Sequence, residues 1–208
     1  MPDDEQPVET RPPVVVETRE ACESIVVIRL NRPAERNHLS VATLEELDRL
    51  VSALSARTDI SAIIFTGTGD AFASGANIRE LSRLTPETAS EFARRGQRLM
   101  QRIADASQLT IAAVNGYCMG GGLDLALACD LRCAAASAVF AHPGARLGII
   151  TGWGGTQRLT RLIGQARALE MFMTARRLTA GEAYGNGLVN RIGDPVLECA
   201  LALARTHA

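Results

Sequence analysis

The sequence contains no lysine: its 22 basic residues are all arginine, against 23 acidic residues. Without a lysine amine the chain cannot form a Schiff base with a carbonyl substrate. It also lacks the Gly-Lys-Ser/Thr sequence that holds phosphates in nucleotide-binding P-loops. Because the formal net charge is only −1, the composition gives no electrostatic reason to expect nucleic acid as a partner.

Long hydrophobic runs and metal-binding cysteine spacings are also absent from the sequence. No apolar run reaches the roughly 18 residues that a membrane helix needs. Residues 1–13 are acidic and rich in proline, unlike a signal peptide. The 5 cysteines lack the spacing of a zinc site, so no metal is expected, and small buried side chains in a reducing compartment explain them best. We therefore expect a cytoplasmic protein without a membrane anchor.

The composition, with 47% hydrophobic and 22% charged residues among 208, is that of a globular chain with one sizeable core. We expect a disordered tail at residues 1–13, a main domain at 14–192 and a short C-terminal helical region at 193–208. Hydrophobic periodicity predicts strands at 14–18, 24–30, 59–67, 110–114 and 131–140. It predicts helices at 41–56, 81–106 with a new start at Thr85 and Pro86, 157–175, and from 198 onward.

The segment around Gly120–Gly122 carries most of the functional information. The apolar run Thr110–Val114 predicts a buried strand before it, and an apolar helix follows the glycines. The first N–H groups of a helix have no partner within it and carry partial positive charge, so this arrangement suits an anion. Gly121 lacks a Cβ, which lets a ligand oxygen approach the backbone. Asp124 is the acid in the first turn. The spacing is not that of a dinucleotide fingerprint, which makes a nucleotide-binding module the weaker interpretation.

Other stretches share this design. Ala71–Leu81 follows a predicted strand and precedes a helix, Gly152–Leu159 is a further glycine-rich segment, and Leu30–Pro33 ends the second strand. In their order and spacing, these motifs resemble the crotonase (enoyl-CoA hydratase/isomerase) superfamily over residues 14–192.

The resemblance implies an α/β, crotonase-like (ClpP/crotonase) fold of repeated ββα units, with the usual C-terminal helical region shortened. It implies an acyl-CoA substrate of fatty acid metabolism, with coenzyme A as part of the thioester and no covalently bound cofactor. It also implies a homotrimer or a dimer of trimers. By motif position, the backbone N–H groups of Ala76 and Gly121 would hold the thioester oxyanion, and Asp124 would be the acid–base group.

Further residues are expected at the coenzyme A thioester by the same resemblance: Arg36, His38, Ser74, Asn77, Ile78, Tyr117, Gly120, Pro143, Gly144 and Leu147. Arg36 could meet a phosphate or be a solvated surface arginine. His38 stands where the family has a small residue, and it could face solvent or crowd the pantetheine. Asn77 replaces the family's usual Asp, and a helix N-terminal role explains it best. Ser74 has no base beside it, so a nucleophilic serine is not expected.

The chain departs from the family at both acids used for hydration. Hydratases of the family hold water with two glutamates, which correspond here to Asp124 and Gly144. Aspartate is one methylene shorter, which withdraws its carboxylate by about 1.5 Å, and glycine has no side chain. A standard two-glutamate hydration is therefore not supported. An oxyanion hole and one carboxylate are sufficient for double-bond isomerisation through an enolate.

Two other residues have open roles. His142 lies two residues before Gly144 and could be a substitute base, but a loop histidine bonded to the backbone is the simpler interpretation. Trp153, the only tryptophan, could face the acyl pocket or pack in the core. The alternative function is a non-catalytic acyl-CoA-binding or assembly protein. A carboxylate that reaches the pocket would favour the enzyme, whereas Asp124 held in a structural bond would favour the alternative.

Overall fold

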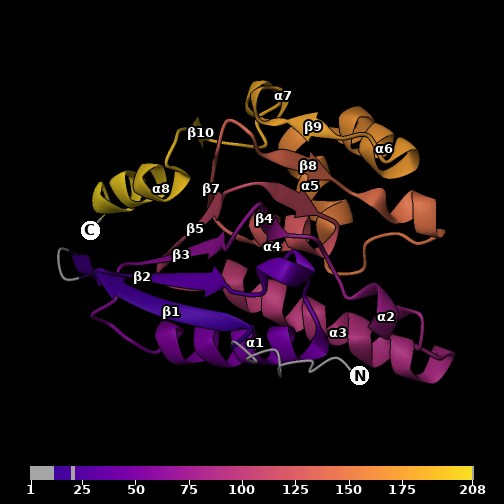
Figure 1. The fold of residues 1–208 in the computed structure, drawn as a ribbon, viewed down its shortest axis with the longest axis horizontal. Helices are drawn as coiled ribbons and strands as arrows, with labels where there is room; N and C mark the ends of the chain where they lie inside the picture. The colour runs from indigo at the N-terminus through magenta and orange to yellow at the C-terminus, as the bar shows by residue number, and fades with distance from the viewer. Residues whose placement is uncertain (1–11, 20–21, 208) are drawn as a thin grey trace, which may run out of the picture.

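The computed structural model describes residues 12–19 and 22–207. The tail expected at residues 1–13 lies outside this range except for Pro12 and Pro13. Helices surround two sheets, with the N-terminal half of the chain on one side of Figure 1 and the C-terminal half on the other. Across residues 12–19 and 22–207, every helix is too short or too polar for a membrane crossing.

The large sheet contains, among the described residues, six strands in the order β1–β2–β3–β5–β7–β10. Only β1 and β2 pair antiparallel, and the other neighbours are parallel. The strand bounds are β1 Val14–Arg19, β2 Cys22–Leu30, β3 Ala62–Gly67, β5 Leu109–Val114, β7 Leu131–Ala134 and β10 Arg191–Ile192.

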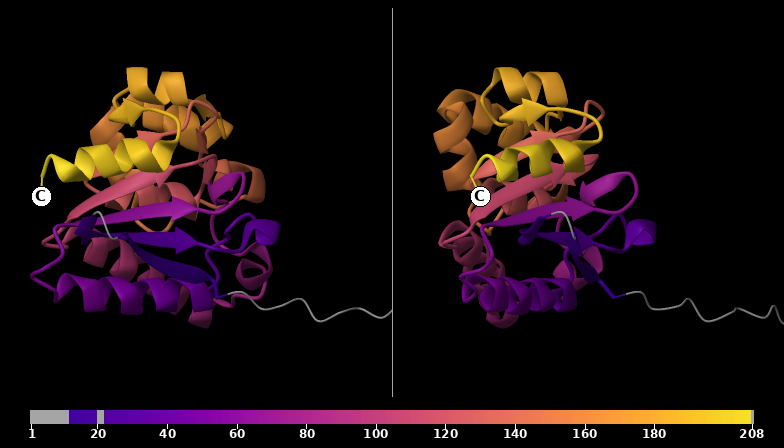
Figure 2. Two further views of the ribbon diagram at one scale, coloured as in Figure 1. Left: turned by 60° about the vertical axis from the view of Figure 1, so that its left-hand side comes forward. Right: turned by 90° about the vertical axis from the view of Figure 1, so that its left-hand side faces the viewer.

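Both faces of the central strands β2, β3, β5 and β7 are largely buried, which explains the unbroken apolar runs in these strands. Val26 and Ile28 point into one hydrophobic cluster, whereas Ile25 and Val27 point into the other. Helix α1 (Val41–Ser55) packs against helix α3 (Pro86–Ala104) on the first side, and α8 (Val196–Arg205) covers the second (Figure 2).

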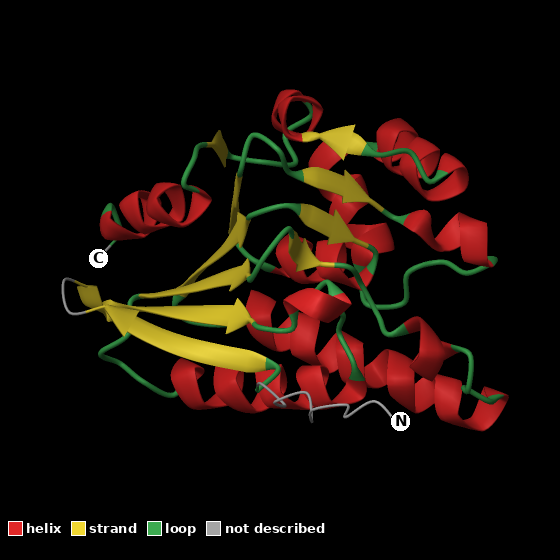
Figure 3. Ribbon diagram, in the orientation of Figure 1, coloured by secondary structure: helices red, strands yellow, loops and turns green. Residues whose placement is uncertain are grey.

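The small sheet has, within the same residues, four strands in the order β4–β6–β8–β9. Their bounds are β4 Ala71–Ala73, β6 Tyr117–Met119, β8 Val139–Ala141 and β9 Leu178–Thr179. The first three are parallel, and β9 pairs antiparallel with β8. Strands β3, β5 and β7 of the large sheet are each followed by a small-sheet strand and then by helix (Figure 3). The predicted repeat of ββα units is confirmed.

The remaining helices are short. They are α2 Ile78–Leu81, α4 Gly121–Ala128, α5 Gly155–Ile163, α6 Gln165–Thr174, α7 Ala180–Gly185, and the 3-10 helices η1 Pro33–Glu35 and η2 Pro143–Leu147.

Two predicted elements are wrong in extent. The strand predicted at 131–140 is two strands, β7 and β8, which belong to different sheets. The residues between the two strands are mostly alanine, so hydrophobic periodicity could not show where the first strand ends. The helix predicted at 157–175 is divided into α5 and α6 at Gly164, where φ is +83°. On α6, after the break, the apolar side chains of Leu169 and Met173 are 55% and 69% exposed.

Arg132 holds the C-terminal end of α4, the helix that starts at the glycine turn. The side chain is buried, and its guanidinium donates to the carbonyl oxygens of Cys129 at 2.6 Å and Leu188 at 2.8 Å. A cation at a helix C-terminus also interacts favourably with the helix dipole. Arg132 therefore links the C-terminal end of α4 to the segment that follows α7.

We predict that Arg132→Met lowers the free energy of unfolding by at least about 3 kcal/mol, because several buried carbonyls lose a charged donor. Urea unfolding monitored by circular dichroism measures this change. The matched control is Arg161→Met, since Arg161 is exposed on α5. A loss at Arg132 no larger than at Arg161 would contradict this account of α4.

Candidate active site

A cavity of about 280 Å³ lies where the chain leaves β4, β6 and β8. Because parallel strands end at the same edge of a sheet, the loops that follow them converge there. Residues 74–76 follow β4, residues 120–124 follow β6, and residues 142–153 follow β8. We call this the main cavity. Its outer rim is apolar, with Ile78 60% and Leu147 51% exposed.

The turns after β4 and β6 approach each other closely. Gly75 has φ +103° and Gly120 has φ +51°, conformations that favour glycine. A Cβ on Gly75 would lie 3.3 Å from the backbone nitrogen of Gly121. In the described part of the chain, the N–H groups of Ala76 and Gly121 donate to no acceptor, and both residues line the main cavity. The site thus holds two unpaired backbone donors on adjoining turns.

Trp153 closes one wall of the main cavity. Its ring occupies the space where a Cβ on Gly96 or Gly121 would lie, 2.2 Å and 2.3 Å away. The side chain is 4% exposed and packs between α3 and α4 while lining the cavity. Both interpretations of this residue, core packing and a place in the pocket, therefore hold.

Asp124 lies in the first turn of α4 and lines the main cavity, although it is only 1% exposed. The Thr151 hydroxyl donates to its Oδ2, and its Oδ1 has no hydrogen-bond partner among the described residues. Burial raises the pKa of Asp124 from 3.8 to about 7, an effect that the Thr151 bond and the charge of Arg158 partly offset. The carboxyl group can therefore hold or release a proton near neutral pH.

His142 faces this carboxyl group. Its Nε2 lies 3.4 Å from Oδ1 of Asp124, and its ring centroid is 5.0 Å from that of Phe172. The side chain is 3% exposed, and burial lowers the pKa of His142 to about 4. Within the described residues, no hydrogen bond joins its side chain to the backbone, so the loop-histidine interpretation is not supported.

Gly144 also lines the main cavity, but a side chain cannot be added there without moving the backbone. A Cβ on Gly144 would lie 2.5 Å from the carbonyl oxygen of Ile149. The N–H of Ile149 donates to the Gly144 carbonyl at 3.0 Å, which holds the two segments together. Backbone atoms therefore occupy the space that a side chain at 144 would enter first.

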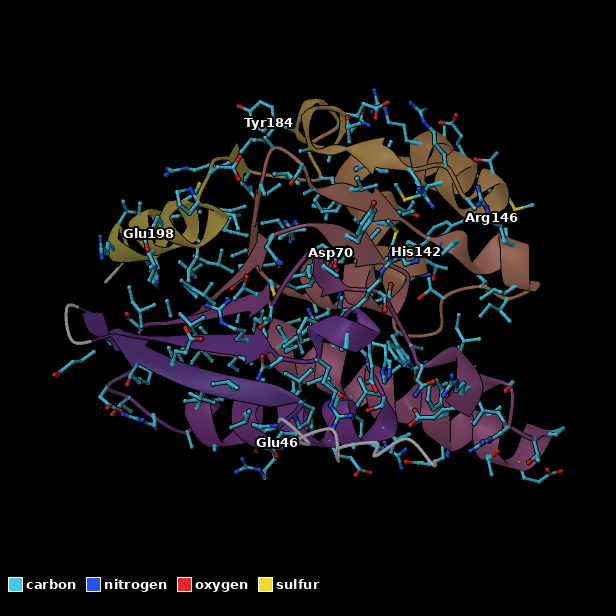
Figure 4. The ribbon with its side chains drawn as sticks, viewed as in Figure 1. Glu46, Asp70, His142, Arg146, Tyr184 and Glu198 are labelled. Carbon is cyan, nitrogen blue, oxygen red and sulfur yellow. The ribbon has the colours of Figure 1, made fainter. Side chains whose placement is uncertain are left out.

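A second cavity, of about 360 Å³, adjoins the main one and shares Ser74 and Pro143 with it. Its walls include Arg36, Arg146, Arg177 and Tyr117, and the Arg36 guanidinium lies 5.7 Å from the Tyr117 ring centroid. We call it the arginine cavity. Figure 4 shows His142 inside the molecule and Arg146 towards its edge. Sequence reasoning missed Arg146 and Arg177, because they lie far from Arg36 in the chain.

Two predicted contact residues lie apart from these cavities. His38 pairs with Glu35, with Nε2 2.9 Å from the carboxylate, and lines neither cavity. Asn77 lines neither cavity and accepts the N–H of Arg79 as the N-cap of α2, which agrees with its helix-terminal interpretation. The other predicted positions line one cavity or both: Arg36, Ser74, Ile78, Tyr117, Gly120, Pro143, Gly144 and Leu147.

Comparison with known proteins identifies the family of the chain. A family model described as enoyl-CoA hydratase/isomerase matches residues 20–206. The chain is 41% identical to the crotonyl-CoA hydratase of Syntrophomonas wolfei over 174 residues, covering 83% of this chain and 67% of that protein. It is 37% identical to the short-chain-enoyl-CoA hydratase of Clostridium acetobutylicum, covering 82% of this chain and 66% of that protein. The chain belongs to the enoyl-CoA hydratase/isomerase family.

A solved structure of a family member has the same fold. The enoyl-CoA hydratase of Bacillus anthracis superimposes with a TM-score of 0.88 at 38% identity, covering 93% of this chain and 76% of that one. The chain thus spans about two thirds of the length of the curated relatives described above. In the described residues, His, Cys, Asp and Glu side chains do not gather in groups that could hold a metal ion.

The raised pKa of Asp124 makes a prediction about stability. Between its ordinary value of 3.8 and its folded value of about 7, the unfolded chain releases a proton that the folded protein keeps. Stability from this group is therefore lost as the pH rises through this window. The Asp124→Asn side chain cannot ionise. The free energy of unfolding of this variant, relative to that of the wild type, should therefore rise by on the order of 3 kcal/mol between pH 5 and pH 8.

Urea unfolding of both proteins at the two pH values measures this difference. The exposed Asp105 offers the matched control Asp105→Asn, which should show little pH-dependent gain. An equal difference between Asp124→Asn and wild type at both pH values would contradict the raised pKa.

Proposed function

We propose that this protein is an acyl-CoA enzyme of the hydratase/isomerase group that acts on a thioester through an enolate. The observation that carries the proposal is the position of Asp124, which lines the main cavity three residues after Gly121 on the same helix turn. A proton-transfer group and unpaired backbone donors thus share one cavity.

The thioester oxygen would bind between the N–H groups of Ala76 and Gly121. Removing a proton from the carbon beside a thioester carbonyl places negative charge on that oxygen. Preorganised backbone donors stabilise such charge, and the N-terminus of α4 adds partial positive charge in the same direction. Within residues 12–19 and 22–207 these two N–H groups have no acceptor, which supports this role.

Asp124 would supply the acid–base chemistry. In a 3-enoyl thioester its carboxylate takes a proton from C2, the electrons move onto the thioester oxygen, and the same carboxyl group returns the proton to C4. The product is the 2-enoyl thioester, and the aspartate recovers its starting charge. A pKa of about 7 suits a group that must both accept and donate a proton.

Coenzyme A would extend from the main cavity into the arginine cavity. Guanidinium groups recognise phosphates through paired N–H donors, and Arg36, Arg146 and Arg177 converge there from separate elements. The shared lining residues Ser74 and Pro143 make the two cavities neighbours, as one bound thioester would require.

The alternative is an acyl-CoA-binding or assembly protein without catalysis. The Thr151 hydroxyl bond to Asp124 favours it, because a carboxylate held in a structural bond is less free to transfer protons. The unpartnered Oδ1 and the cavity lining by Asp124 favour the enzyme, which we retain as the proposal.

Assembly and location remain predictions. The exposed apolar side chains of Leu169 and Met173 on α6 support a contact between subunits of a homotrimer or a dimer of trimers. The free thiols of Cys118, Cys129 and Cys133 are buried, which supports a reducing cytoplasm.

We predict that Asp124→Ala reduces turnover of a 3-enoyl-CoA by about 10²–10⁴-fold, because the positioned acid–base group is removed. Product formation and acyl-CoA binding are measured on the same preparation, with Asp105→Ala as the control. Turnover lost with binding retained supports the proposal. If the wild type binds crotonyl-CoA and 3-butenoyl-CoA but converts neither, the binding protein is the correct alternative.

We also predict that Arg177→Gln raises the dissociation constant for coenzyme A about 5- to 20-fold, because a phosphate contact is lost. Isothermal titration calorimetry at two salt concentrations measures it, and the difference from wild type should shrink at high salt. Arg161→Gln is the control, since Arg161 lies outside both cavities. Equal affinities for the two variants would exclude the arginine cavity as the phosphate site.

A further inference from the structure

Asp124 and His142 form a buried polar pair that lacks the hydrogen bonds expected of its atoms. Oδ1 of Asp124 and Nε2 of His142 are both enclosed and unpartnered among the described residues, although they lie only 3.4 Å apart. Buried polar atoms are nearly always paired, so two facing exceptions call for an explanation. Both side chains line the main cavity, so the pair borders the space where a substrate would bind.

The backbone around the pair leaves room for it. A Cβ on Gly155 would lie 2.0 Å from Oδ1 of Asp124 and 3.0 Å from Nε2 of His142. The first residue of α5 therefore has to be glycine for the two side chains to face each other. On the opposite side, Thr151 fixes Oδ2 of Asp124, which leaves Oδ1 turned towards the imidazole.

The surroundings of the pair favour its uncharged state. Burial raises the pKa of Asp124 to about 7 and lowers that of His142 to about 4. Arg158 is the cation that acts on Asp124, and the nearby thiol of Cys118 stays protonated because burial raises its pKa. Two titratable groups whose environments separate their pKa values in this way are suited to act as an acid and a base.

We propose that Asp124 and His142 act as one acid–base pair that hydrates a 2-enoyl thioester, with His142 as the base that the glycine at position 144 cannot provide. This inference rests on the function proposed above and adds a second reaction to the same site. It requires no cofactor, because water and the thioester supply every atom of the product.

The proton transfers of hydration return both side chains to their starting protonation states. Neutral His142 takes a proton from water, and the resulting hydroxide forms a bond to C3 of the substrate. The double-bond electrons move through C2 onto the thioester oxygen, which the N–H groups of Ala76 and Gly121 hold. The enolate then takes the proton of Asp124 at C2. The imidazolium of His142 returns its proton to the Asp124 carboxylate across the 3.4 Å between Nε2 and Oδ1, which restores both groups.

The pH dependence of hydration follows from this cycle. The working state has Asp124 protonated and His142 neutral, which holds between pH values of about 4 and about 7. The apparent pKa values at the two ends of this range belong to the pair and not to either residue alone, because the two groups interact. The rate constant kcat/KM for hydration should therefore fall below and above this window.

The test compares hydration of crotonyl-CoA with isomerisation of 3-butenoyl-CoA in wild type, His142→Gln and Asp124→Asn. We expect His142→Gln to lower the rate of hydration at least about 100-fold more than the rate of isomerisation, since only hydration needs the second base. Asp124→Asn should lose both reactions. The control is His207→Gln, since His207 is exposed at the end of the chain. Cooperative unfolding and crotonyl-CoA binding establish that each variant is folded.

Each possible result supports or overturns the proposed acid–base pair. A wild type that isomerises without hydrating overturns the pair and leaves the proposed function standing, whereas a wild type that performs neither reaction overturns both. Equal losses of both reactions in His142→Gln, or no loss, also overturn the pair. If His142→Gln does not fold, the wild-type pH profile decides: two limbs support the pair, and a single limb overturns it.

Discussion

The close approach of two turns, after β4 and after β6, is the constraint on which the site depends. A Cβ on Gly75 would lie 3.3 Å from the nitrogen of Gly121, and a Cβ on Gly122 would lie 2.3 Å from the carbonyl oxygen of Ala73. Only glycines let the start of α4 lie this close to β4. The same approach leaves N–H groups near Asp124 that have no acceptor among the described residues. The Trp153 ring fills the space beside Gly121.

Burial then sets the chemistry of the side chains at this point. In water an aspartate is ionised near neutral pH, and a histidine is partly protonated below it. Enclosure moves both groups towards their uncharged forms, and neutral groups cost less to bury than an ion pair. A carboxyl group with a raised pKa, such as that of Asp124, can still exchange a proton near neutral pH. The properties of the site come from the environment of Asp124 and His142 more than from their intrinsic acidity.

Much of the fold was predictable because its signals are local. The apolar runs of β2, β3 and β5, the start of α3 at Thr85 and the glycine turns all have short-range causes. The division of 131–140 was not predictable, because alanine fits a strand and a turn alike. In the site, the motifs pointed to Ala76, Gly121 and Asp124, which line the main cavity. Tertiary structure alone brings His142 opposite Asp124. It also brings together the three arginines of the arginine cavity, which are far apart in the sequence.

The central claim is that the two turns and Asp124 hold one reacting thioester. The most direct test is a crystal structure of Asp124→Asn with crotonyl-CoA. The account predicts the thioester oxygen within about 3.2 Å of the backbone nitrogens of both Ala76 and Gly121, with C2 facing residue 124. A thioester bound elsewhere, or one whose oxygen contacts neither nitrogen, would contradict it.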